Sequence, residues 1–483
     1  MRKNRTMVVL GTNRNQRGRR RPLVWRENQG NKNIGTAKMA KEDDSLPEST
    51  RSMLLVFNSL NLKPHGLSTY CTSMKYASEQ HIMPTLRACL AMLPLLLGTA
   101  QAAPSTPPPL RIGVTGAFTG NSSPMGLSMR EGIRLATEEI NSQGGIGGRI
   151  LQLVERDDAG QNERGIRIAH EFTTRQKLDA VIGFVNTPVV LASIGIYQQA
   201  RMPVMVTIAT APEILQRHQQ APVHYIFRVS APDDTQAELI VQEAVRRDGL
   251  RRVAIFADTT PYGRNGQAQL LKALARRGLK PVNIENFGQN ERDLNLALAR
   301  SKDAGAETLL TYGIGSPLAA IANGMKKMGW HVPIMGSWTL SMSNFIDQAG
   351  PNAEGTRMVQ TFIENSNEIR QQAFSKRFYQ RFHTKRMRSP SAVAQGYDGM
   401  LLLAQGLRES QGEGGVKLVQ ALEELRNPVE GVIARYERPY SRHDHEAIDD
   451  SIPLIGIVRI GSVTFAHPQD RMRALPKPAP AIP

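Results

Sequence analysis

The sequence predicts an α/β protein made of two similar units, each a doubly wound parallel sheet. Short apolar segments alternate with amphipathic helical segments from Arg111 onward, which is typical of a parallel sheet covered by helices on both faces. This alternation ends at "YIFRVS" and then starts again, so we place a change of unit near 227–230. The 381 residues from 103 to 483 are enough for two domains of ordinary size.

The first unit is expected to begin with the strand "LRIGV". A helix should start at Ser123-Pro124, because proline suits the first helical turn, and it should stop at Gly144-Gly145. Its apolar face repeats at spacings of four, three and four residues: Met129, Ile133, Ala136 and Ile140. The elements that follow are the strand "RILQLVERDD", a helix over 162–176, the strand "DAVIGF", a helix over 189–200 and the strand "MPVMVTI".

The second unit repeats this order. Its expected strands are "RRVAIFAD", "KPVNIENF", "AETLLTYG" and "HVPIMGS", and its expected helices cover 234–247, 262–277 and 317–328. A further strand, "TRMVQTF", precedes two helices over 369–383 and 393–410. Beyond Gly431 the chain is strand-like, with "GVIARYE" and "PLIGIVRIGSVTFA", and we expect the final "PKPAPAIP" to be a frayed end.

An export signal is predicted inside the chain. The apolar run over 90–97 is broken by Pro94 and is shorter than the roughly 20 residues that a membrane-spanning helix needs. It fits the apolar region of a secretory signal, and Ala100-Gln101-Ala102 supplies small residues at the cleavage positions. The alternative is a buried apolar helix, which the following proline-rich spacer disfavours.

Met83 stands where an initiator would precede this signal. We therefore expect residues 83–102 to be a signal peptide, residues 1–82 to be a non-native or disordered leader, and the mature protein to be exported to the periplasm. Both cysteines, Cys71 and Cys89, fall outside this mature chain, so no disulfide is expected within it.

The charge of the chain says little about its partners. The net charge is +17, but residues 1–82 alone carry 15 basic and 6 acidic residues. The stretch "RNQRGRRRPLVWREN" in this leader would suit a nucleic-acid arm or a targeting arm, and it is equally what unselected upstream sequence would supply. We expect no nucleic-acid partner, because the excess that remains in the mature chain is modest.

A candidate binding site lies where the predicted strands end. Open parallel α/β sheets bind ligands beyond the carboxyl ends of their strands. Hydroxyls and free N–H groups at helix starts suit anionic groups, and aromatic side chains suit an apolar ligand body. The same residue types also serve as ordinary helix caps and turn formers. The candidates are Asn121, Ser122, Ser123, Asn186, Thr187, Ala209, Thr210, Tyr262, Tyr312 and Trp338.

From about Leu110 to Ala466 the sequence resembles a known family. The helix end "EINSQGGIGGR" followed by "ERDDAG" carries the resemblance, together with "VIGFVNTPV", "PVMVTIATAPEI", "TPYGRNG", "LLTYGIGSP", "PIMGSW" and "AQGYDGM". It is similar to the extracytoplasmic solute-binding proteins of ABC transporters with the type I periplasmic-binding fold, in the branched-chain amino-acid-binding group.

This resemblance implies two lobes joined by a three-crossover hinge, with the ligand held between them. The crossovers would fall near Ser230, Thr361 and Asn427. The implied N-terminal lobe comprises residues 110–229 and 362–427, the C-terminal lobe comprises 230–361 and 428–466, and 467–483 form a tail.

The resemblance also assigns roles to individual residues. Thr187, Ile208 and Thr210 match the family positions that hold the carboxylate and amine of the ligand, and Tyr262 matches an aromatic position of the second lobe. The acidic residue that pairs with the ligand ammonium in amino-acid binders is replaced here by Trp338. Since an indole stabilises a cation only partly, by about 0.5–2 kcal/mol, a carboxylate or amide with an aromatic or apolar body fits better.

Other functions have weaker support. The dense group His443, Asp444, His445 and Glu446 could suggest a metal, but adjacent residues rarely converge on one ion, so we expect no metal and no cofactor. "GGIGG" lacks the Lys-Ser/Thr of a phosphate loop, and no nucleophile motif appears, so no catalytic residues are expected. We expect a monomeric importer component that delivers a small solute to inner-membrane permease subunits. The alternative is an exported ligand-sensing domain.

Overall fold

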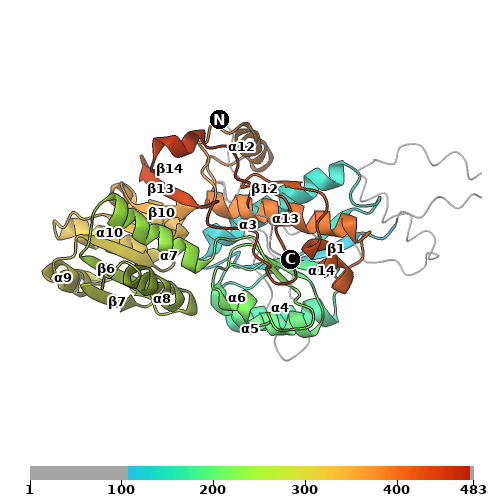
Figure 1. Ribbon diagram of the computed structural model, residues 1–483, viewed down its shortest axis with the longest axis horizontal. Coiled ribbons are helices and arrows are strands. Elements are labelled where there is room, and N and C mark those ends of the chain that lie inside the picture. The colour runs from blue at the N-terminus through green and yellow to red at the C-terminus, as the bar shows by residue number, and fades with distance from the viewer. Residues whose placement is uncertain (1–106, 479–483) are drawn as a thin grey trace, which may run out of the picture. The chain divides into compact units, whose positions relative to one another are not determined.

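The computed structural model describes residues 107–478 (Figure 1). The predicted leader over 1–82 and the predicted signal peptide over 83–102 lie outside the described residues, as do Cys71 and Cys89. In the part of the chain that the structure describes, no helix is long and apolar enough to cross a membrane.

The first lobe is built on a five-stranded parallel sheet in the order β2-β1-β3-β4-β5. Its strands are Leu110–Gly116 (β1), Leu151–Asp157 (β2), Ala180–Gly183 (β3), Val204–Val206 (β4) and Ile226–Arg228 (β5). Its helices from this part of the chain are Ser123–Ser142 (α3), Asn162–Thr174 (α4), Thr187–Gln199 (α5) and Glu213–Gln216 (α6). The predicted alternation of strands and helices is confirmed, and the strand order reverses between β1 and β3, where ligands bind in such sheets.

Three later helices complete this lobe: Ile369–Phe382 (α12), Pro390–Glu409 (α13) and Gly415–Glu423 (α14). The helices α3 and α13 lie backbone against backbone at two glycines. A Cβ at Gly132 would stand 2.0 Å from the carbonyl oxygen of Val393, and one at Gly396 would stand 2.3 Å from that of Met129. The close packing of these two helices therefore requires glycine at both positions.

The second lobe has a seven-stranded sheet in the order β14-β13-β10-β9-β8-β6-β7. Its strands are Val253–Asp258 (β6), Asn283–Phe287 (β7), Thr308–Tyr312 (β8), Ile334–Gly336 (β9), Arg357–Gln360 (β10), Leu454–Arg459 (β13) and Ser462–Phe465 (β14). Its main helical segments are Asp233–Val241 (α7), the π-helical turn Gln242–Arg247 (η2), Pro261–Ala275 (α8), Asn295–Asp303 (α9), Ser316–Lys327 (α10), Trp338–Ser341 (η3), Ser343–Ala349 (α11) and Gly350–Ala353 (η4).

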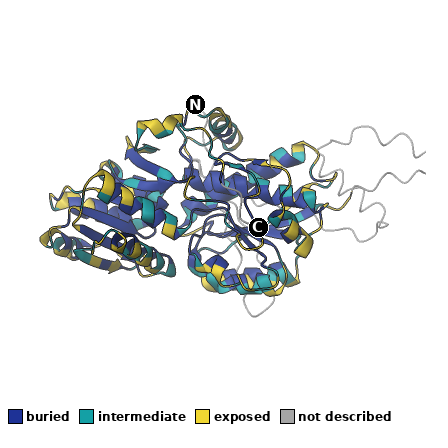
Figure 2. Cartoon of the chain, in the orientation of Figure 1, coloured by how far each residue is buried: buried dark blue, intermediate teal, exposed yellow. Residues whose placement is uncertain are grey.

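This second sheet is parallel from β6 to β10, but β13 and β14 are antiparallel to their neighbours. The two strands form a hairpin whose turn is Ile460-Gly461, with φ values of 50° and 70°. Two positive φ angles fit the twist of a two-residue hairpin. In both lobes the inner strands are buried, whereas the edge strands β2, β7 and β14 are partly exposed, as are the outer faces of the helices (Figure 2).

The third passage between the lobes comes later than the sequence suggested. After the predicted crossover at Asn427, the hairpin Val429–Glu430 (β11) and Arg435–Tyr436 (β12) stays on the first lobe. The carboxylate of Asp398 on α13 accepts hydrogen bonds from the N–H groups of Val432 and Ile433, at 2.8 and 2.9 Å.

Further along the chain, the N–H of Ala447 donates to the carbonyl oxygen of Arg228 on β5 at 3.0 Å. The boundary at 427/428 therefore lies too early. The chain reaches the second lobe only at β13, because a buried carboxylate and the edge of β5 hold the intervening segment on the first lobe.

Candidate functional site: the interlobe face

The ends of β1 and β3 bring three predicted site residues together. Ser122 precedes α3, and Asn186 and Thr187 stand at the start of α5. The side-chain amide of Asn186 donates a hydrogen bond of 2.8 Å to the hydroxyl of Ser122. Because β1 and β3 are parallel neighbours, their carboxyl ends meet at one edge of the sheet.

This edge holds polar atoms that are buried without a partner. Asn186 and Thr187 are 5% and 2% exposed, and among the described residues neither Oδ1 of Asn186 nor Oγ1 of Thr187 has a hydrogen-bond partner. Neither α3 nor α5 has a side-chain cap. The first N–H groups of α3 have backbone partners, because Ser123 donates to the carbonyl oxygen of Gly120 and Met125 to that of Ser122, so the start of α5 is the better candidate for binding a ligand. The hydroxyl of Thr187 can donate to a carboxylate or carbonyl oxygen of a ligand, whereas Oδ1 of Asn186 can only accept, from an N–H or O–H of a ligand.

The backbone between β3 and Asn186 is in an unusual conformation. Phe184 has a φ of 70°, in the left-handed region that side chains other than glycine rarely adopt. Its carbonyl oxygen accepts from the N–H of Ala209 at 3.0 Å, and the hydroxyl of Ser230 donates to the carbonyl of Ala209 at 2.9 Å. Ile208 and Ala209 are buried. The backbone of Ala209 therefore ties the end of β4 to the residue after β3 and to the first passage between the lobes.

The second lobe contributes aromatic side chains. Tyr262 is the second residue of α8, Tyr312 ends β8 and Trp338 follows β9, and all three are buried. The rings of Tyr262 and Tyr312 lie 5.1 Å apart, and the Tyr262 hydroxyl donates to Ser337 at 2.8 Å. The N–H of Trp338 donates to the side chain of Gln236 at 3.3 Å. The structure thus brings these three aromatic residues close to one another.

Asp233, at the start of α7, connects the strand ends of the first lobe to the aromatic residues of the second lobe. This residue was not identified from the sequence. Its N–H donates to the carbonyl oxygen of Thr210 at 3.1 Å. Its carboxylate accepts from the hydroxyl of Tyr312 at 2.9 Å and from the amide of Asn265 at 2.6 Å. Burial raises the pKa of Asp233 to about 6, although hydrogen bonds from Tyr312 and Asn265 oppose the rise. The sequence offers only the signal of an acidic residue at a helix start.

The two lobes also contact each other through residues that are more exposed. The side-chain amide of Asn121 donates to Asn290 at 3.3 Å, and the amide of Asn344 donates to the carbonyl oxygen of Asn121 at 3.1 Å. The N–H of Ser343 on α11 donates to the carbonyl of Arg388 at 2.9 Å. Ser123, the first residue of α3, is half-buried. The structure therefore has its lobes in contact through Asn121 of the first lobe.

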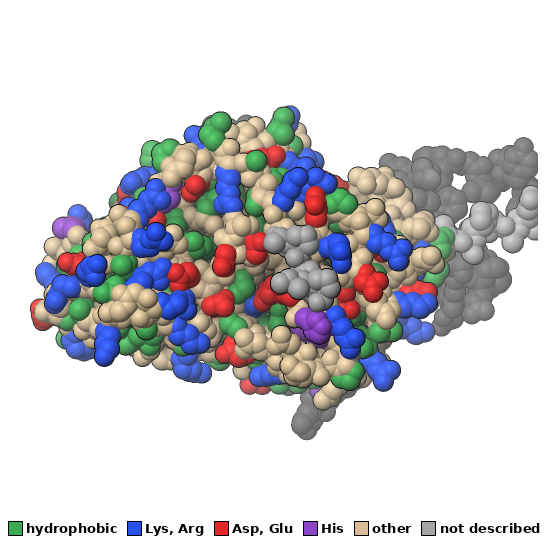
Figure 3. All heavy atoms as spheres, viewed as in Figure 1, with side chains coloured by type: hydrophobic (Ala, Val, Ile, Leu, Met, Phe, Trp, Pro, Cys, Tyr) green, Lys and Arg blue, Asp and Glu red, His purple; other side chains and the backbone are tan. Residues whose placement is uncertain are grey.

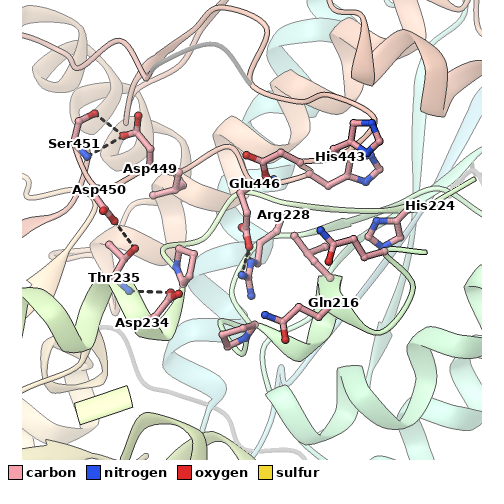
Figure 4. Close-up of a pocket in the computed structure, with 17 residues that line it drawn as sticks. Gln216, His224, Arg228, Asp234, Thr235, His443, Glu446, Asp449, Asp450 and Ser451 are labelled. Atoms are coloured by element: carbon pink, nitrogen blue, oxygen red, sulfur yellow. Dashed lines mark hydrogen bonds and ion pairs between the residues drawn. The ribbon is translucent and has the colours of Figure 1, made fainter. Parts of the chain in front are cut away.

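A separate cavity of about 650 Å³ lies beside the first and third passages (Figure 4). Arg228 is fully buried at its wall, and its Nε donates to Glu446 at 2.8 Å. Acidic side chains gather at the middle of the face in Figure 3. Within residues 107–478 no group of three or more His, Cys, Asp or Glu side chains is arranged to hold a metal ion.

Two α/β lobes joined by three passages of chain, with polar strand ends facing aromatic ones, define a two-lobed ligand-binding protein. Residues 109–454 match the family model of periplasmic binding proteins. The chain belongs to this family and shares the type I fold of solved periplasmic binding proteins.

Three comparisons illustrate the relationship. A Leu/Ile/Val-binding protein homologue from Brucella abortus (strain 2308) is 27% identical over 270 residues, covering 56% of this chain and 69% of that protein. A leucine-binding protein from Thermotoga maritima has a TM-score of 0.65 at 19% identity, covering 74% of this chain and 99% of that one. A solute-binding protein from Rhodopseudomonas palustris BisB5, in complex with 3,4-dihydroxybenzoic acid, has a TM-score of 0.63 at 20% identity, covering 73% and 94%. At these identities the solved structures share the fold, and all three relatives are described as binding proteins.

Proposed function

We propose that this protein is the substrate-binding component of an ABC importer, that it works in the periplasm as a monomer, and that it captures a small organic solute between its lobes. The observation that carries the proposal is the uncapped start of α5, where the buried Oδ1 of Asn186 and Oγ1 of Thr187 have no partner among the described residues. Membership of the periplasmic binding protein family supports the export and the delivery to permease subunits.

The residues between the lobes favour a carboxylate or amide with an aromatic or apolar body. Tyr262, Tyr312 and Trp338 supply the apolar wall. Asp233 is the carboxylate nearest to them in the bonding network, and both of its oxygens already accept hydrogen bonds from protein side chains. A ligand ammonium would therefore have to share Asp233 with these protein donors, which makes it a weaker partner than an unengaged carboxylate. The related protein in complex with 3,4-dihydroxybenzoic acid shows that the fold accommodates such a ligand.

A thermal-shift screen of residues 103–483 tests the proposal. Amino acids, aromatic carboxylates, dicarboxylates and amides are each added in excess, because a ligand that binds only the folded state raises the melting temperature. We expect aromatic carboxylates or amides to raise it most and to be recovered chemically unchanged. Stabilisation by leucine or valine alone would overturn the ligand class, and conversion of the ligand would overturn the binding function.

A further inference from the structure

The last described part of the chain, residues 467–478, does not trail away from the fold. We call this segment the C-terminal strap. It leaves β14 of the second lobe, forms the short 3-10 helix Pro468–Met472 (η5) and continues to Pro478. The sequence predicted a frayed end beginning at Pro476, yet the carbonyl oxygen of Pro476 accepts a hydrogen bond from the N–H of Arg435 at 3.0 Å.

The strap is bound to the second passage between the lobes. The guanidinium of Arg471 donates to the carbonyl oxygen of Asn365 at 2.8 Å, and the N–H of Asn367 donates back to the carbonyl oxygen of Arg471 at 3.1 Å. Asn365 also donates through its side chain to the hydroxyl of Thr464 on β14 at 2.6 Å. These reciprocal bonds fix η5 to the chain between β10 and α12.

The strap is bound to the third passage as well. The guanidinium of Arg473 donates to the carbonyl oxygens of Ser451 and Ile452, the latter at 3.5 Å. Three residues later, Pro476 bonds to Arg435 on β12. That hairpin belongs to the first lobe, because the hydroxyl of Tyr436 donates to Asp398 of α13 at 2.9 Å.

The strap is therefore a fourth connection between the lobes, made of hydrogen bonds rather than of continuous sheet. From Arg473 to Pro476 it can span at most about 3.3–3.6 Å per residue. A rotation of the first lobe that moves β12 away from the third passage must therefore break the bond between Arg435 and Pro476 or pull Arg473 from its carbonyls.

We propose that the strap is a built-in restraint that favours the arrangement in which the lobes touch. A contact that exists in only one of two conformations shifts the population toward that conformation. The same shift raises the apparent affinity for any ligand that binds between touching lobes, since apparent affinity is proportional to the competent fraction. The restraint is a property of the ligand-free protein, so it stands apart from the identity of the solute and from import.

Distance measurements between the lobes test the restraint. Residues 103–483 contain no cysteine, so spin labels at cysteines introduced for the exposed Lys177 and Lys327 report one first-lobe and one second-lobe position. Two strap variants are compared without ligand: a chain ending at Ala474, and Arg473→Gln in the full-length protein. Arg459→Gln is the matched control, because Arg459 pairs at 3.3 Å with Glu354 of the same lobe.

We expect longer and broader distances in both strap variants and an unchanged distribution in Arg459→Gln. The population of separated lobes should rise about 3- to 10-fold, which is the worth of one or two hydrogen bonds. An unchanged distribution in Arg473→Gln, or the same broadening in Arg459→Gln, would overturn the proposal. If the chain that ends at Ala474 does not fold, the comparison of Arg473→Gln with the wild type decides the question alone.

Discussion

Tyr312 on β8 donates a hydrogen bond of 2.9 Å to Oδ1 of Asp233, the residue that begins α7. The two residues are fully buried, and Asp233 bonds in turn to the backbone of Thr210 on the first lobe. Asp233 thus links the sheet of the second lobe, through its carboxylate, to the first passage and the end of β4, through its backbone N–H.

The variant Asp233→Asn should change how stability depends on pH. Burial raises the pKa of Asp233 to about 6 from an ordinary value of 3.8, so the native state holds this proton more tightly than the unfolded chain does. Its contribution to the unfolding free energy is therefore full below about pH 4 and is lost as the pH rises through 6. The unfolding free energy of the wild type minus that of the variant should fall by about 2–3 kcal/mol between pH 4 and pH 6.5, measured by urea unfolding. The exposed neighbour provides the control Asp234→Asn, and a difference that stays flat with pH would contradict the assignment.

Thr187→Val should separate ligand binding from stability. The variant keeps the shape and removes a buried hydroxyl that has no partner among the described residues, so the melting temperature should hold or rise slightly. Affinity for the best carboxylate of the thermal screen should fall about 10- to 100-fold by calorimetry, because a bond to a charged group is lost.

The matched control for that change is Thr308→Val. The hydroxyl of Thr308 donates to the carbonyl of Pro333 at 3.0 Å within the second lobe. This variant should lose about 1 kcal/mol of stability with no change in affinity. If Thr187→Val binds the ligand with normal affinity, the anionic end of the ligand does not bind at Thr187.

Trp338 should report ligand binding by fluorescence. Trp338 follows Ser337, which accepts a hydrogen bond from Tyr262, the ring neighbour of Tyr312. Trp330, the other tryptophan of the described chain, packs in a separate apolar cluster of the second lobe. Added carboxylate should shift or quench the emission of the wild type and of Trp330→Phe, but not that of Trp338→Phe. Trp338→Ala should also cost about 3–5 kcal/mol of stability, because the indole is only 3% exposed. A signal that persists in Trp338→Phe would place the indole outside the site.

Ligand should raise the fraction of molecules whose lobes touch, and the ligand itself should remain unaltered. Small-angle scattering should show a smaller radius of gyration on saturation, and chromatography should return the ligand intact. Arg386→Gln removes an ion pair with Asp347 across the lobes, but both side chains are about half exposed. Such a pair is worth at most about 1 kcal/mol, so the variant should still close and lose less than about fivefold in affinity. A constant radius would count against hinge closure.

The local pattern of the sequence predicted most helices and strands, because each depends on residues a few positions apart. The start of α3 at Ser123, before Pro124, is one example. The third passage was not predictable in this way. Its position depends on Asp398, which binds Val432 and Ile433 more than thirty positions along the chain, and no local period records such a contact.

The site residues show the same difference between signals that are local in the sequence and contacts that are distant in it. Strand ends and helix starts indicated Ser122, Asn186 and Thr187, and the structure places them together. The hydrogen bond between Tyr312 and Asp233, by contrast, joins residues that are 79 positions apart in the chain. Its sequence signal is one acidic residue at a helix start, and that is indistinguishable from an ordinary favourable charge at a helix N-terminus.

The glycine-to-backbone packing of α3 against α13 also has a consequence for how the chain acquires its fold. The first lobe needs residues 390–409, which follow the strands β6 to β10 of the second lobe in the chain. The parallel strands β6 to β10 are contiguous in sequence, and β13 and β14 are added later. As the chain emerges from the ribosome or from a secretion channel, the earlier half of the first lobe must wait for its partner helix. Such long-range closure slows folding and leaves apolar surface open to aggregation. We therefore expect the second lobe to become protected from hydrogen exchange first, although its sequence begins later.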